Sequence, residues 1–260
     1  MKIATFNING IKARIEALPR WLQGSGADVV CLQEIKSIDE GFPRALFEAE
    51  GWQVETHGQK GFNGVAILSR LPLSDVTRRL PGDDADEQAR WIEADVQGVN
   101  GAVRVCCLYL PNGNPAPGPK YDYKLAWMAR MQARVEDLLT KEQPLVLAGD
   151  YNVIPQPQDA ARPESWVEDA LFLPQSREAF RRLLHLGLTE AIRTRDPRPS
   201  VYTFWDYQAG AWEKNNGIRI DHLLLSPQAA DRMTGTGIDK AVRGEEKPSD
   251  HVPVWVELDI

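Results

Sequence analysis

Short apolar runs follow one another along the whole chain, and their length and composition predict a protein built largely from strands. Each run is rich in Val, Ile, Leu or aromatic residues. The predicted strands are Lys2–Ile8, Asp28–Leu32, Gly64–Leu68, Trp91–Val96, Val103–Leu110, Pro144–Ala148, Ile218–Leu225 and Val252–Leu258. Because Trp91–Val96 and Val103–Leu110 are consecutive, we expect them to pair as a hairpin.

Helical patterns lie between some of these strands, and they predict helices over Lys12–Gln23, Pro43–Ala49, Tyr123–Thr140 and Ser176–His185. In the third segment an apolar stripe recurs at spacings of three or four, through Leu125, Met128, Met131, Val135 and Leu138. Helices and strands do not alternate strictly. This mixture favours an α/β (α+β) fold, with two mixed sheets and helices outside them, over a purely parallel sheet.

Length and composition are those of an ordinary globular protein. The chain has 260 residues, 43% hydrophobic and 26% charged, which excludes a disordered or fibrous chain and favours one domain over residues 1–260. No apolar stretch is long enough to span a bilayer, and the first ten residues are patterned as a strand and a turn. The three cysteines form no CxxC pair. We therefore expect a protein of a reducing, cytoplasmic compartment without membrane association.

The net charge of -7, taken alone, counts against a nucleic-acid partner, since phosphate groups favour basic surfaces. Total charge is a coarse measure, however. A site that holds a cation needs carboxylates, and a basic face can coexist with an acidic one on the same molecule. Composition therefore names no partner.

Polar side chains are placed where several predicted strands begin or end. They are Asn7, Asn9, Glu34, Asp150, Asn152, Asp221, Asp250 and His251. A single carboxylate at such a position is usually a turn or capping residue, but several together favour a functional site. Carboxylates and amides are hard oxygen ligands, so the set suits Mg²⁺ or Mn²⁺ and not zinc.

His251 follows Asp250 directly, and in an extended backbone their side chains point apart. The imidazole then needs another carboxylate to orient it, and Asp221 is the candidate. A carboxylate that accepts from one ring nitrogen leaves the other free to face a substrate.

At these residues the sequence resembles the bacterial branch of the exonuclease III family, the class II apurinic/apyrimidinic endonucleases of the endonuclease/exonuclease/phosphatase superfamily. The blocks ATFNINGIKAR, LQEIK, YLPNG, GDYNV, RIDHLLLS and SDHVPVW occur in the family's order from Ala4 to Trp255. GDYNV and SDHVPV are shared across the superfamily. The segments KYDYKLAW and YTFWDY favour the exonuclease III branch.

The resemblance implies a four-layer αββα sandwich of two mixed sheets flanked by helices. It also implies Mg²⁺-dependent hydrolysis, with Mn²⁺ as a substitute, of the phosphodiester 5′ to abasic sites in duplex DNA, leaving a 3′-hydroxyl. Exonuclease activity in the 3′→5′ direction and 3′-phosphatase activity often accompany it. The implied partner is double-stranded DNA with abasic sites or blocked 3′ ends, bound by a monomer.

The resemblance also assigns roles. It implies that Glu34 and Asp250 bind the metal and that Asn7 and Asn9 order that site, although Asn9 is Asp in many relatives, which leaves the number of ions open. Asp150 corresponds to the proposed base, and His251, oriented by Asp221, to the phosphate-binding histidine. The phosphate contacts correspond to Tyr109, Asn112 and Asn152, and the pocket for the base-free sugar to Phe204, Ile218 and Ile220 with Trp212 nearby. Basic candidates for gripping DNA are Lys36, Arg90, Lys120, Lys124 and Lys214.

Two other functions fit parts of the pattern. A superfamily phosphoesterase for small substrates would share GDYNV and SDHVPV, but we would not expect it to carry KYDYKLAW and YTFWDY. A non-catalytic DNA-binding protein would have lost a key acid, and every one is present.

Overall fold

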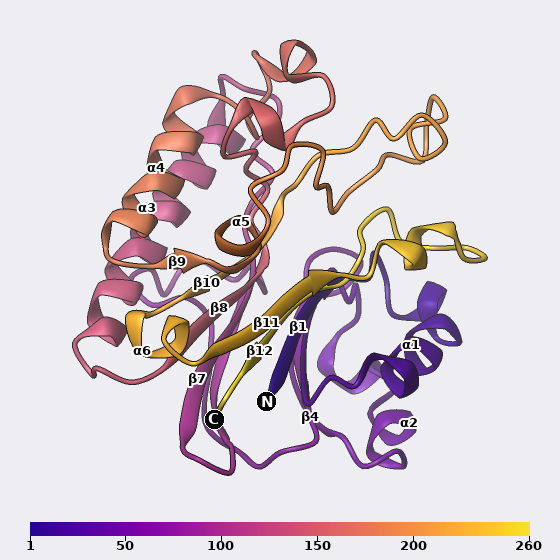
Figure 1. The fold of residues 1–260 in the computed structure, drawn as a ribbon, viewed down its shortest axis with the longest axis vertical. Coiled ribbons are helices and arrows are strands. Elements are labelled where there is room, and N and C mark those ends of the chain that lie inside the picture. The colour runs from indigo at the N-terminus through magenta and orange to yellow at the C-terminus, as the bar shows by residue number, and fades with distance from the viewer.

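Two six-stranded sheets face each other in the structure, a computed structural model that describes residues 1–260 (Figure 1). The first sheet has the order β11 (Met233–Ile238), β12 (Val254–Leu258), β1 (Lys2–Asn7), β2 (Val29–Gln33), β4 (Val65–Ser69) and β3 (Gln53–His57). The second has the order β5 (Leu73–Arg78), β6 (Trp91–Gln97), β7 (Ala102–Tyr109), β8 (Leu145–Asp150), β10 (Asp221–Leu225) and β9 (Thr189–Glu190). Each sheet contains one parallel pair, β1 with β2 and β7 with β8, and all other neighbouring strands are antiparallel. Both sheets are therefore mixed.

Helices cover the outer face of each sheet, which makes four layers (Figure 1). The helices are α1 (Ala17–Ser25), α2 (Arg44–Glu48), α3 (Pro119–Leu139), α4 (Pro174–His185), α5 (Ala191–Arg195) and α6 (Pro227–Ala230). Helices α1 and α2 lie on one side and α3 and α4 on the other. Short 3₁₀ segments occur at Lys12–Arg14, Asp39–Gly41, Pro157–Asp159, Pro163–Trp166 and Lys240–Gly244. The predicted four-layer sandwich is confirmed, and no helix combines the length and apolarity of a bilayer span.

The core follows from the period of two along each strand, which sends alternate side chains to opposite faces. Ile3, Val105 and Val146 belong to a cluster shared by the two sheets. Adjacent residues Cys106 and Cys107 enter different clusters: Cys107 lies between the sheets and Cys106 lies under α3 and α4. All three cysteines are free and buried.

The predicted hairpin Trp91–Val96 with Val103–Leu110 is confirmed by the antiparallel pairing of β6 with β7. Strands β3, β5, β9 and β11 were not predicted. They lie at the edges of their sheets, and β5 and β11 are largely exposed or carry glycines. An edge strand buries little of its surface, so it leaves no apolar run in the sequence.

Three elements begin three or more residues away from their predicted start. Lys12–Gln23 is not one helix, because α1 begins only at Ala17, where Pro19 falls in the first turn and needs no hydrogen-bond partner for its nitrogen. α3 begins at Pro119 rather than Tyr123. The strand predicted from Ile218 begins at Asp221, and Ile218 itself forms only isolated bridges.

Candidate active site

Strand register brings the predicted acidic residues to one end of both sheets. Asp150 ends β8, where it pairs with Asp221 at the start of β10 and with Tyr109 at the end of β7. In the other sheet, Asn7 ends β1 beside the end of β2, and Glu34 follows directly. Residues that are distant in sequence are therefore neighbours because their strands end together.

One buried amide joins the two sheets at this point. Asn7 Nδ2 donates to Glu34 Oε1 and to Asp150 Oδ2, both at 2.9 Å. Burial raises the pKa of Glu34, but the hydrogen bond from Asn7 and the ammonium of Lys36, 3.0 Å from Oε2, outweigh it, so that the net pKa is lowered. Glu34 is therefore held as a carboxylate.

Three residues of this site have left-handed backbone. Asn9, Glu34 and Asn152 have φ values of 47°, 50° and 46°. For residues other than glycine this conformation costs of the order of 1 kcal/mol each, and it is typical of functional sites.

A cleft of about 320 Å³ opens over these residues. Its lining combines an acidic and amide end with an apolar end: Glu34, Tyr109, Asn112, Asn114, Asp150, Asn152, Trp166, Asp169, Leu171, Phe204, Asp206, Ile218, Ile220, Asp250 and His251. Such a cleft can hold a ligand with one charged and one apolar part.

Asp150 is almost fully buried in the floor of the cleft. Burial and the nearby charge of Asp221 raise the pKa of Asp150 to about 7, although the positive charge of His251 opposes the rise. The backbone N–H of Asn152 donates to Oδ1 at 2.9 Å and fixes the carboxylate. A carboxylate with this pKa can accept a proton near neutral pH.

His251 pairs with Asp221, as predicted. Its Nδ1 lies 2.9 Å from Oδ2 and 3.1 Å from Oδ1, while the Thr203 hydroxyl donates to Oδ2 at 2.6 Å. Burial alone would lower the pKa of His251, but the charges of Asp221 and Asp150 raise it to about 10. The ring is then an imidazolium whose Nε2 lies 3.7 Å from Asp150 Oδ2.

Glu34, Asp150 and His251 each offer a ligand atom, and these atoms lie within 4.8 Å of one another. A doubly protonated imidazole has no lone pair for a metal, which leaves carboxylate oxygens as the donors. The amide of Asn9 donates to Asp250 Oδ1 at 3.1 Å and accepts from Lys36 Nζ at 2.5 Å. These hard oxygen donors fit a divalent cation such as Mg²⁺.

The predicted phosphate contacts line the cleft. Asn112 Nδ2 donates to Asn152 Oδ1 at 3.3 Å, and Asn152 Nδ2 donates to the carbonyl of Leu110 at 2.9 Å. Burial and the charges of Glu34 and Asp150 raise the pKa of Tyr109, so its side chain remains a neutral hydroxyl.

The apolar wall contains Phe204, Ile218 and Ile220, as predicted, together with Trp166 and Leu171. Trp166 and Leu171 were not predicted, because they follow the GDYNV block in a loop without periodic pattern. The only signal there is a tryptophan among polar residues. Trp212 does not line the cleft. Its ring packs edge-on against Trp205, with centroids 5.0 Å apart.

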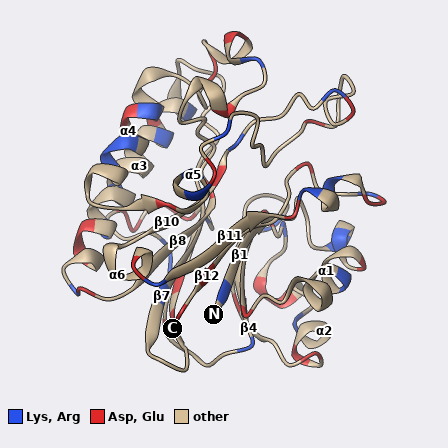
Figure 2. Ribbon diagram, in the orientation of Figure 1, with Lys and Arg blue, Asp and Glu red and all other residues tan.

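The basic candidates occupy different environments. Lys120 is exposed at the start of α3, Lys214 donates to the carbonyl of Ala209, and Arg90 packs over the ring of Tyr109. Lys124 is completely buried, so the prediction that it contacts DNA directly is wrong. Figure 2 shows that charges of both signs are spread over the helices and loops.

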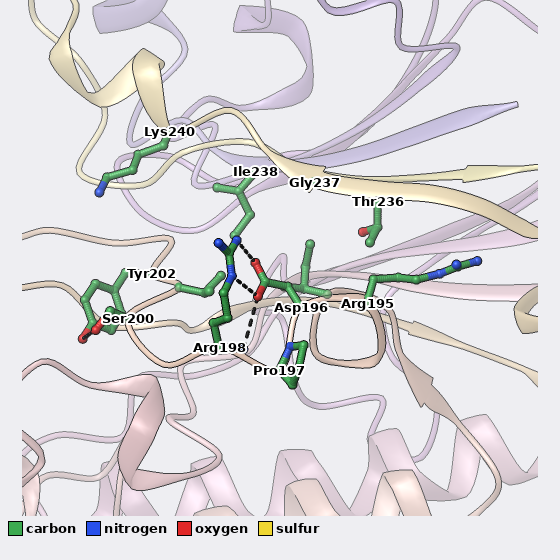
Figure 3. Close-up of a pocket in the computed structure, with 12 residues that line it drawn as sticks. Arg195, Asp196, Pro197, Arg198, Ser200, Tyr202, Thr236, Gly237, Ile238 and Lys240 are labelled. Carbon is green, nitrogen blue, oxygen red and sulfur yellow. Dashed lines mark hydrogen bonds and ion pairs between the residues drawn. The ribbon is translucent and has the colours of Figure 1, made fainter.

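A second cavity, of about 620 Å³, lies between α5 and β11 (Figure 3). Its carboxylate, Asp196, is paired with Arg198 at 2.7 Å. No cluster of carboxylates faces this cavity. The cleft over Glu34 and Asp150 is therefore the candidate active site.

Fold and cleft together define a hydrolase built on two facing mixed sheets with an acidic centre at the strand ends. The profile of the endonuclease/exonuclease/phosphatase family matches residues 4–251. Exodeoxyribonuclease III of Haemophilus influenzae is 36% identical over 266 aligned positions, which span 99% of this chain and 100% of the relative. The chain therefore belongs to the endonuclease/exonuclease/phosphatase family, in its exodeoxyribonuclease III branch.

Solved structures agree. A 3′-5′ exonuclease from Neisseria meningitidis superposes with a TM-score of 0.96 at 38% identity, over 100% of both chains. A 3′ phosphatase from Neisseria bound to a product DNA hairpin gives the same values. An AP endonuclease from Archaeoglobus fulgidus has a TM-score of 0.94 at 36% identity, also over 100% of both chains. The predicted family and the class of hydrolytic nuclease are confirmed.

Proposed function

We propose that the protein is a DNA repair nuclease that hydrolyses the phosphodiester 5′ to abasic sites in duplex DNA and leaves a 3′-hydroxyl. We also propose 3′→5′ exonuclease and 3′-phosphatase activity on blocked 3′ ends. The observation that carries the proposal is the joining of Glu34 to Asp150 through Asn7, beside the His251–Asp221 pair. The names of the related nucleases, and the DNA hairpin bound by one of them, support DNA as the substrate.

Phosphodiester hydrolysis needs an activated water, positive charge at the phosphate oxygens and help for the leaving oxygen. Asp150 is the proposed base, because its raised pKa lets it take a proton from water near neutral pH. The imidazolium of His251 donates from Nε2 to a phosphate oxygen. Tyr109, Asn112 and Asn152 supply further hydrogen bonds that orient the phosphate in the cleft.

Glu34 and Asp250 are the proposed ligands of Mg²⁺, for which Mn²⁺ would substitute. When bound, the ion would neutralise charge on the phosphate and on the leaving oxygen. The amides of Asn7 and Asn9 are engaged in hydrogen bonds to these carboxylates, so we assign them the role of orienting the ligands. Such partners commonly fix the geometry of a metal site.

Abasic specificity would come from the apolar end of the cleft. Phe204, Ile218 and Ile220 present a surface that fits a deoxyribose turned out of the helix, and the limited space would exclude an attached base. Trp166 and Leu171 extend this wall from the segment after β8. The sugar and its phosphate would thus occupy the two chemically different ends of one cleft.

We further propose that residues 1–260 act as one domain, as a monomer, in the cytoplasm. The core shared between the sheets supports the single domain, and the three free cysteines suit a reducing compartment. Light scattering after size exclusion tests the monomer, for which the mass of 29.1 kDa is expected.

Two variants test the assigned chemistry. Asp150→Asn removes the base and His251→Ala the positive donor, so each should lower kcat on an abasic duplex by about 100-fold or more. As a control, Asp137→Asn makes the same Asp-to-Asn substitution on the exposed surface of α3 and should leave kcat unaltered. Near-normal activity of either cleft variant would contradict its role. Cleavage of small phosphate esters without cleavage of DNA would indicate the small-substrate phosphoesterase instead.

A further inference from the structure

Lys124 interrupts the apolar stripe of α3. The stripe consists of the buried residues Tyr121, Trp127, Met128, Met131, Val135 and Leu138, and Lys124 occupies the position of the same face between Tyr121 and Met128. Its exposed fraction is 0%, although lysine is almost never fully buried without a partner. A charged residue in the middle of a core face calls for an explanation by function or by specific contacts.

The contacts are with two loops of the cleft. Lys124 Nζ donates to the backbone carbonyl of Asn152 at 2.6 Å and to that of Asn112 at 3.1 Å. The Asn112 loop follows β7 and the Asn152 loop follows β8, and the two side chains meet through a hydrogen bond of 3.3 Å. The buried ammonium therefore joins the backbones of both loops, while the side-chain amides of the same two residues line the cleft.

The lysine stem is enclosed as closely as its head group. Gly113 passes over it with a φ of 93°, and a Cβ at that glycine would lie 2.7 Å from Lys124 Cδ. The loop that carries Asn112 can approach α3 only because residue 113 has no side chain. The backbone of the loop is thus shaped around this lysine.

No carboxylate forms an ion pair with Lys124. Burial lowers its pKa to about 7, although the charges of Asp150 and Asp169 act against this. An apolar residue would fill the same stripe without the cost of burying an ammonium. The arrangement is therefore one that stability alone does not favour.

The geometry points to Lys124 as a positioning residue, whose two hydrogen bonds set the separation of the Asn112 and Asn152 amides that hold the phosphate. This inference rests on the proposed function, since it assumes that a DNA phosphate binds between these amides. Lys124 does not touch the substrate. It acts through Asn152 and Asn112, and an error of about 1 Å in such groups can lower turnover by about 100-fold.

A double-mutant cycle tests the inference on a duplex with a tetrahydrofuran abasic analogue in Mg²⁺. Lys124→Met keeps the apolar stem and removes the donors, and we expect kcat to fall by about 10- to 100-fold while KM changes by less than about twofold. In an Asn152→Ala background the same change should lower kcat by less than about threefold, because one of the two amides that Lys124 positions, and the hydrogen bond between them, are already gone. Lys141→Met, at an exposed position in the turn just after the same helix, is the control and should behave as wild type.

Separate results distinguish the possible failures. The positioning role would be overturned if Lys124→Met kept the kcat of the wild type, or if the two single-variant reductions in kcat multiplied in the double variant. In either case, cleavage by the wild type would leave the proposed function intact. No cleavage by the wild type would instead refute the proposed function. Lys124→Gln retains an N–H donor one bond closer to the helix, so partial recovery of kcat is expected. This variant carries the same test if Lys124→Met does not fold.

Discussion

Replacing Asp221 by Asn tests whether the charge of this residue keeps His251 protonated. Its carboxylate lies 2.9 Å from Nδ1, and it is the strongest of the influences that raise the pKa of His251 against the effect of burial. Asn has the same shape and can still accept the hydrogen bond from the Thr203 hydroxyl. The substitution therefore removes the charge and retains most of the packing.

The size of the effect follows from the pKa of His251, which is about 10 in the protein and 6.5 for an unperturbed ring. With a pKa returned to 6.5, roughly 3% of the imidazole is protonated at about pH 8 and roughly three quarters at about pH 6. If the imidazolium is the active form, kcat/KM should fall roughly 30-fold at about pH 8 and less than about twofold at about pH 6.

The assay is kcat/KM on an abasic duplex across this pH range, expressed relative to wild type at each pH. Asp196→Asn makes the same chemical change beside Arg198, in the cavity away from the cleft, and should have no effect. A loss of the same size at every pH would refute the electrostatic reasoning, because it would indicate damage to the structure. NMR titration of His251 in the metal-free variant checks the shift itself.

Three further predictions concern stability, specificity and DNA binding. Burial opposes ionisation of Glu190, but the charge of Arg219 lowers the pKa of Glu190 to about 2. The ionised carboxylate therefore stabilises the fold by roughly 3 kcal/mol at pH values above its unfolded pKa of about 4.5. This stabilisation is lost as the pH falls from about 4.5 toward 2. Urea unfolding of Glu190→Gln should therefore depend less on pH over this range than that of wild type, and equal dependence would contradict the linkage. Ile218→Ala removes part of the apolar wall and so widens the cleft, and it should reduce the preference for abasic over undamaged duplex by about tenfold. The preference is measured as the ratio of the two kcat/KM values. An unchanged ratio would show that this wall does not contribute to specificity. If about three of the basic side chains contact DNA phosphates, DNA affinity should fall roughly 40-fold between about 50 and 200 mM salt, and a flat profile would contradict binding through basic side chains.

The sequence predicts the central strands well because they are buried on both faces. Every residue of β2, β4, β8 and β10 is buried, and each strand contains a run of three or more apolar residues. Every residue of the edge strand β5 is exposed or half-buried without regular alternation, and its polar residues also suit a loop. Its pairing with β6 depends on a neighbour and not on its own pattern.

The candidate site was predictable as a set of residues but not as an arrangement. Asp150 and Asp221 stand next to apolar runs, which marks them as residues at strand ends. The hydrogen bond from Asn7 to Asp150 spans the two sheets, and no spacing along the chain predicts it. Lys124 resembles a surface cation in the sequence, because the carbonyl groups that satisfy it belong to loops elsewhere in the chain.

The central claim is tested most directly with a 5′-labelled duplex that carries one tetrahydrofuran abasic analogue, incubated with Mg²⁺ or with EDTA beside an undamaged duplex. The account predicts metal-dependent cleavage immediately 5′ of the analogue, and shortening of the undamaged duplex would report the accompanying exonuclease. Intact duplexes in Mg²⁺, or cleavage that persists in EDTA, would contradict it.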